Sequence, residues 1–116
     1  MRKEIRSDLQ KSRLDTAIGI LFDYDERWIN FFYSHKGGEL RRGPHELIAE
    51  ASCFSRGEQI MIKVALDLWT DDCRASISEI IEYLDWINLN RVLLAIMTMR
   101  DVAIEDLVDA GSRYEG

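Results

Sequence analysis

The run from Phe54 to Trp69 constrains the fold of this chain more than any other segment. It opens with Ser55 and Glu58, whose spacing is that of a capping box, in which each side chain accepts a hydrogen bond from a backbone N–H at the helix start. Almost every later residue is apolar. The polar ones recur every fourth residue, so they form one narrow stripe that we expect to face solvent: Gln59, Lys63 and Asp67. A helix with so little polar surface needs other helices around it. The run therefore predicts an all-α fold with a buried central helix over about 56–69.

Apolar residues at helical spacing predict further helices on both sides of this one. Upstream we expect helices from near Arg2 to Phe22, from Glu26 to about Ser34, and from Pro44 to about Cys53. Downstream we expect a short helix opened by a second capping box, Ser76-x-x-Glu79, a helix capped by Asp85 or Asn88, and a last one near 104–108. The apolar residues that we expect these two 76–100 helices to bury are Ile77, Ile80, Ile81, Leu84, Leu89, Val92, Leu93 and Ile96. Connections are short and there is one proline, which favours a compact bundle of six or seven helices in a single domain, 1–116.

Composition bounds the class of protein. The chain has 116 residues, of which 47% are hydrophobic and 31% charged, as in globular domains. No apolar run approaches the roughly 20 residues that a membrane span requires. The charged start, Met1–Asp8, lacks the apolar run of a signal peptide, so we expect a cytoplasmic protein with no membrane partner. Cys53 and Cys73 are then expected to be free thiols.

Charge is spread unevenly along the chain. Residues 1–42 have a net charge of +2 and residues 43–116 a net charge of −8, which gives −6 overall. A −6 surface repels nucleic-acid phosphates, so nucleic acid is an unfavoured partner, whereas a protein with a basic surface is a suitable one. The residues that we expect at such an interface are Asp71, Asp72, Glu79, Glu82 and Trp86. Trp86 belongs with them because it stands at a helix junction, where an aromatic ring is easily left exposed to a partner.

Two other functional classes stay open. Glu79 and Glu82 fall on one helix face, with Asp85 close behind, and could hold a divalent cation in a helical enzyme or ligand binder. Such a site needs a second acidic helix opposite, and Glu46 with Glu50 fits that role poorly.

The third class is a nucleic-acid-binding regulator. The loop from Gly37 to Gly43 combines glycines with Lys36, Arg41 and Arg42, groups that attract an anion. No phosphate-loop or nucleophile-elbow motif accompanies it. The separations of His35, His45, Cys53 and Cys73 match no compact zinc motif, so the sequence indicates no metal and no cofactor.

Several short motifs are shared with a known group of proteins. They are Phe54-Ser55-x-Gly57-Glu58 leading into Ala65–Trp69, then Leu84-Asp85, and finally Asn90–Leu93 with Ala95-Ile96. Over about Phe54–Met99 the chain resembles small helical proteins of phages and mobile elements. It departs from their pattern at Arg56 and Thr70. That family has no assigned activity, so the resemblance implies a phage-like origin and a helical fold and transfers no functional residues.

Together these observations predict a non-enzymatic module for protein–protein interaction. In its sharper form the protein is a small acidic phage or mobile-element product that binds and inhibits a host or defence protein with a basic surface. The sequence leaves the identity of the partner and the oligomeric state open.

Overall fold

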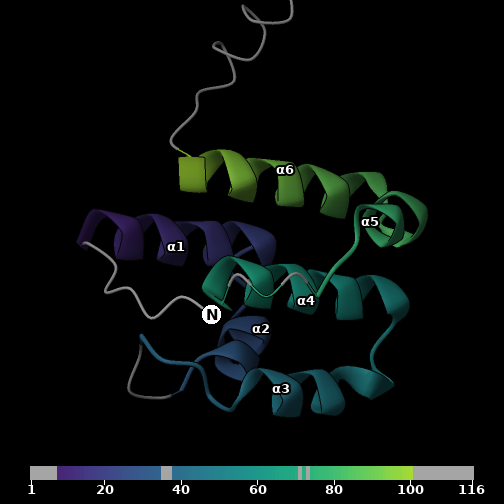
Figure 1. The fold of residues 1–116 in the computed structure, drawn as a ribbon, viewed down its shortest axis with the longest axis horizontal. Coiled ribbons are helices and arrows are strands. Elements are labelled where there is room, and N and C mark those ends of the chain that lie inside the picture. The colour runs from purple at the N-terminus through teal and green to yellow at the C-terminus, as the bar shows by residue number, and fades with distance from the viewer. Residues whose placement is uncertain (1–7, 35–37, 71, 73, 101–116) are drawn as a thin grey trace, which may run out of the picture.

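The computed structural model describes residues 8–34, 38–70, 72 and 74–100. The elements are α1 (Asp8–Leu21), α2 (Glu26–Phe32), α3 (Pro44–Glu50), the 3₁₀ turn η1 (Ala51–Cys53), α4 (Arg56–Thr70), α5 (Ile77–Tyr83) and α6 (Trp86–Arg100) (Figure 1). Helices hold 77% of the described residues, and the only β pairing among them is a bridge between Tyr33 and Leu40. The all-α prediction is confirmed. The expected helix near 104–108 and any start of the first helix before Asp8 lie outside the described residues.

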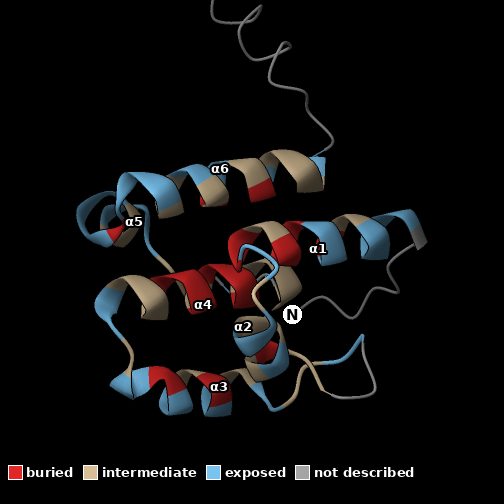
Figure 2. Ribbon diagram, turned by 180° about the vertical axis from the view of Figure 1, so that it is seen from behind, coloured by how far each residue is buried: buried red, intermediate tan, exposed pale blue. Residues whose placement is uncertain are grey.

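Helix α4 lies at the centre of the bundle. In Figure 1, α6, α1, α4 and α3 follow one another from top to bottom, while α2 and α5 run across them. Of all the helices, α4 supplies the largest share of the core, and its fully enclosed side chains include Ile60, Ile62 and Leu66. Figure 2 shows the same concentration of buried residues along α4 and the inner half of α1. The predicted buried central helix is confirmed. None of the described helices is both long and apolar enough to cross a membrane.

The predicted caps determine where three helices begin. Both bonds of the first capping box form, with Glu58 N–H donating to Ser55 Oγ at 3.2 Å and Ser55 N–H donating to Glu58 Oε1 at 3.0 Å. The second box, between Ser76 and Glu79, forms in the same way at the start of α5. Asp25 caps α2 by accepting the N–H of Arg27 at 2.9 Å. Each cap satisfies backbone donors that the first turn of a helix leaves unpaired.

Helix α1 ends in a left-handed turn formed without glycine. The N–H of Tyr24 donates to Gly19 O at 2.8 Å and the N–H of Asp23 donates to Ile20 O at 3.1 Å, which is the Schellman pairing. Asp23 and Tyr24 have φ of 54° and 53°, a region that glycine normally occupies. The Tyr24 ring lies over Gly19, where an added Cβ would clash with the ring. Gly19 therefore makes room for the aromatic ring that covers the helix end.

The polar stripe of α4 does not simply face solvent, and that prediction is wrong. Gln59 Nε2 donates to the carbonyls of Ser52 and Phe54, and Lys63 Nζ lies 3.4 Å from Glu79 Oε1 on α5. Asp67 accepts two backbone N–H groups from the segment before α5. The stripe binds the connections that enter and leave α4, so its residues are half-buried.

Candidate interaction surface

Exposed apolar side chains gather on two helices. Of the nine large hydrophobic residues that the described chain leaves exposed, seven lie on α5 and α6: Ile77, Ile81, Tyr83, Trp86, Ile87, Leu93 and Ile96. The remaining two, Leu9 and Tyr24, stand apart on or just after α1. A concentration of exposed apolar area on one part of a small domain is typical of a surface that binds another molecule.

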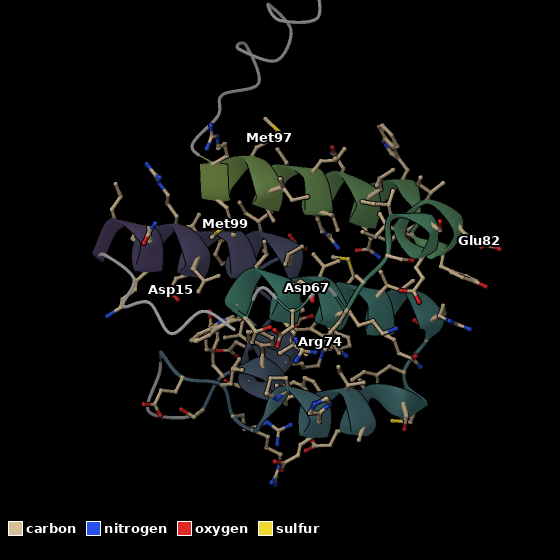
Figure 3. The ribbon with its side chains drawn as sticks, viewed as in Figure 1. Asp15, Asp67, Arg74, Glu82, Met97 and Met99 are labelled. Atoms are coloured by element: carbon tan, nitrogen blue, oxygen red, sulfur yellow. The ribbon has the colours of Figure 1, made fainter. Side chains whose placement is uncertain are left out.

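Polar contacts from α4 hold α5 in place. Lys63 pairs with Glu79, and the Arg56 guanidinium carbon lies 4.7 Å from the centre of the Tyr83 ring, a cation–π distance. At the start of α5, the carboxylate of Asp67 accepts the N–H of Arg74 at 2.6 Å and of Ala75 at 2.8 Å. In Figure 3, Arg74 lies just below Asp67 of α4. Both ends of α5 are therefore attached to α4.

The outward side of α5 is apolar and acidic. Ile77 and Ile81, one turn apart, have exposed fractions of 72% and 71%, whereas Ile80 and Leu84 pack on the core. Glu82 is exposed and points away from the body of the molecule (Figure 3). The prediction that Ile77 and Ile81 are buried is wrong, because a helix of seven residues packed on α4 buries only one side of its wide apolar arc. We call Ile77, Ile81 and Glu82 the α5 surface.

Helix α6 buries one side and exposes the other. Val92 and Ala95 are enclosed where α6 packs on α1 and α4, and Met99 points toward α1 in Figure 3. Leu93 and Ile96, also predicted to be buried, are exposed at 48% and 49%, so that prediction is wrong. Their periodicity identified an apolar helix correctly, but neighbouring helices cover only one of its sides.

The predicted acidic interface residues do not act as one group. Asp71 lies outside the described residues. Asp72 is exposed and pairs with Arg74 at 3.1 Å. Glu79 forms the capping box of α5 with Ser76 and an ion pair with Lys63. Asp85, predicted as a cap and as part of the alternative cation site, caps α6 by accepting the N–H of Asn88 at 2.7 Å. Among Asp72, Glu79, Glu82 and Asp85, only Glu82 makes no hydrogen bond or ion pair with another described residue. Its side chain is exposed and points outward (Figure 3).

Trp86 is the most exposed large apolar side chain of the described chain, at 74%. It opens α6 directly after Asp85, as the sequence placed it. An indole so open to solvent contributes little to folding, and tryptophan is enriched among residues that dominate binding energy.

The basic loop residues are bound within the fold. Arg41 Nη2 and Arg42 Nε lie 2.7 Å and 2.8 Å from the two carboxylate oxygens of Glu50. The hydrogen bond from Arg41 holds the pKa of the Glu50 carboxyl below its ordinary value. Arg41 also stacks on the Phe31 ring and donates to the Phe31 carbonyl. Lys36 lies outside the described residues. An anion at this loop would have to compete with Glu50.

Metal ligation finds no support in the described geometry. Within residues 8–34, 38–70, 72 and 74–100, no three histidine, cysteine, aspartate or glutamate side chains gather closely enough to hold an ion. His45 and Cys53 are exposed, and His35 and Cys73 are outside the described residues. Comparison of the chain with protein-family models, with curated proteins and with solved structures finds no match. The functional argument therefore starts from the exposed surface itself.

Proposed function

We propose that the chain is a non-enzymatic protein-interaction module, and that its α5 surface docks on the partner. The observation that carries this proposal is the exposure of Ile77 and Ile81, at 72% and 71%, beside the outward carboxylate of Glu82. Fully burying an isoleucine side chain stabilises by about 1.5–3 kcal/mol, so two of them supply a useful share of a binding energy. The carboxylate adds a preference for a cationic neighbour.

The partner that this surface fits is a protein with an apolar contact area bordered by lysine or arginine. The net charge of −8 over residues 43–116 would draw such a partner toward this part of the chain and would repel nucleic-acid phosphates. In the finer form of the proposal, the chain is a phage or mobile-element protein that acts in the cytoplasm by blocking a basic host or defence protein. The motifs over Phe54–Met99 and the acidic charge support that form.

The other two classes have weaker support. A metal-dependent site at Glu79, Glu82 and Asp85 would have to recruit Glu79 and Asp85 away from the caps of α5 and α6. A nucleic-acid site at Arg41 and Arg42 would have to displace Glu50 from both guanidinium groups. Each would lose an interaction that the fold already uses, whereas the α5 surface is open.

The test is affinity capture of the full chain from its native host, with matched variants. The wild-type chain, an Ile77→Ser/Ile81→Ser variant and a Leu9→Ser/Tyr24→Ser control are compared by quantitative mass spectrometry. The control removes two exposed apolar side chains from the α1 region, since the exposed fractions of Leu9 and Tyr24 are 59% and 64%. Circular dichroism of each variant checks that the helices remain.

We expect one stoichiometric protein that the wild-type and control chains retain and the Ile77→Ser/Ile81→Ser variant loses. Equal recovery with both double variants would place the contact elsewhere and overturn the proposal. Recovery of a nucleotide or a metal in place of a protein would favour the enzyme class.

A further inference from the structure

Helix α6 carries an uncharged outer face that no described element covers. Its only charged residues are Arg91 and Arg100, and Arg91 Nη2 lies 3.3 Å from Asp23 Oδ2 at the end of α1. The outer face, which we call the α6 face, consists of Trp86, Asn90, Leu93 and Met97, which share one side of a helix because they are spaced by four, three and four residues, with Ile96 at its edge. Met97 points away from the body of the molecule in Figure 3. None of its residues belongs to the α5 surface of the proposed function.

We infer that the α6 face pairs with the same face of a second copy of this chain, with the two helices antiparallel. Leu93 is the middle residue of Trp86–Arg100, so a two-fold axis beside it sets each residue opposite the one equally far from Leu93 on the other helix. Trp86 then lies opposite Arg100 of the second copy, within reach of a cation–π contact. Leu93 lies opposite Leu93 of the second copy, and Asn90 lies opposite Ile96, so the middle of the face is self-complementary.

Charge favours this occupant and this direction. The antiparallel pairing brings Asp85, exposed just before α6, close to Arg100 of the second copy at both ends of the interface. It also places the positive end of each helix dipole beside the negative end of the other, which is favourable. Between those ends the face has no charge, so two chains of net −6 can meet there without like charges in contact. A parallel pairing would instead bring the two Arg100 side chains together.

The available area suits a dimer of modest affinity. A tryptophan side chain covers roughly 150–250 Å² and an aliphatic one on the order of 100 Å². With exposed fractions of 74% for Trp86, 48% for Leu93 and 49% for Ile96, and with their polar neighbours, the face offers on the order of 500 Å² per copy. Two copies then bury about 1,000 Å², the smallest area expected of a biological interface and the size of a weak one. We therefore expect association in the micromolar range.

The test is sedimentation velocity of the full chain between about 1 µM and about 200 µM, a range that brackets this affinity. We expect the wild type to pass from monomer to dimer across it. Leu93→Glu sets two carboxylates together at the axis and should leave a monomer. The control Leu9→Glu, at an exposed leucine on α1, should dimerise like the wild type. An equimolar mixture of Leu93→Glu and Leu93→Lys chains should dimerise again, which excludes misfolding as the cause.

Arg100→Glu tests the direction of pairing. In the antiparallel dimer it sets a carboxylate against Asp85 of the second copy and should weaken association by roughly two- to tenfold. In a parallel dimer it would replace one pair of like charges, Arg100 with Arg100, by another, Glu with Glu, so association would stay about as strong as that of the wild type. A wild-type chain that stays monomeric to the highest concentration, or equal losses from Leu93→Glu and Leu9→Glu, would overturn the inference. The α6 face would then be covered by the chain's own segment after Arg100 or by a different protein. Partner capture by the α5 surface is read from other variants, so it can succeed when dimerisation fails.

Discussion

Asp67 should contribute far more to stability than its place on a polar stripe suggests. Its carboxylate accepts the N–H groups of Arg74 at 2.6 Å and Ala75 at 2.8 Å, and these bonds hold the entry to α5. A hydrogen bond to a charged group contributes about 1.5–3 kcal/mol, and an N–H left without an acceptor costs about 1–3 kcal/mol when buried. Because the site is only half-buried, we expect Asp67→Ala to lower the free energy of unfolding by about 2–4 kcal/mol in total.

The assay is urea unfolding followed by tryptophan fluorescence, with two comparison variants. Lys63→Ala, one turn away on the same stripe, removes a partly exposed ion pair and should cost about 0.5 kcal/mol. Asp67→Asn keeps one carbonyl acceptor and should fall between the two. If Asp67→Ala and Lys63→Ala differ by less than about 0.5 kcal/mol, the two backbone bonds contribute little and the reasoning fails.

Three further predictions test the core, the left-handed turn and a half-buried phenol. Leu66→Ala should cost about 2–4 kcal/mol in the same assay, against less than about 1 kcal/mol for Ile81→Ala on the surface. Gly19→Ala should stabilise by up to about 1 kcal/mol only in a Tyr24→Ala background, where no ring opposes the new Cβ; a double-mutant cycle with no coupling would contradict this. Burial raises the pKa of Tyr33 to about 12, which means that the folded state favours the neutral phenol, so its contribution is complete below pH 10 and is lost as pH rises toward 12. Absorbance titration should show a tyrosine that ionises late in the wild type and is missing from the Tyr33→Phe variant.

Local signals in the sequence predicted the framework of the fold. The boxes at Ser55 and Ser76 and the cap at Asp25 depend on residues within one turn of each other, so no distant contact was needed to identify them. The central helix could be predicted equally well, because a helix with a single narrow polar stripe must be surrounded by other helices to keep its apolar side chains out of water. The helical assignment of the aromatic segment from Trp28 was also right, up to the bridge at Tyr33.

Contacts between residues far apart in the sequence could not be predicted, and the wrong predictions concern residues that depend on such contacts. Helical periodicity gave the apolar residues of α5 and α6 but not how many helices would pack on them, so Ile77, Ile81, Leu93 and Ile96 were predicted to be buried. The role of Asp67 depends on a backbone segment seven and eight residues away that folds back onto it. A two-turn helix with apolar residues over a wide arc was the one available sign that part of α5 stays uncovered.

The candidate site shows the same division. The exposure of the Trp86 ring was predicted from its position at a helix junction, and Trp86 is the most exposed large apolar residue of the described chain. Its role at an interface stays a prediction. The acidic residues were predicted as a group from net charge, and net charge cannot tell a capping carboxylate from an open one. Glu79 and Asp85 have capping roles, so Glu82 is the residue that tests acidic recognition without weakening a helix start.

The association rate of the captured partner with the Glu82→Lys chain tests the central claim most directly. The measurement is surface-based or stopped-flow kinetics from about 50 mM to about 500 mM salt, where the screening length falls from beyond 10 Å to a few ångströms. The control is Glu39→Lys, an exposed carboxylate on the loop before α3. We predict that Glu82→Lys slows association severalfold at low salt, that this loss shrinks as salt rises, and that Glu39→Lys has a smaller effect. Equal rates for the two variants, or a rate independent of salt, would contradict recognition of a basic partner by the α5 surface.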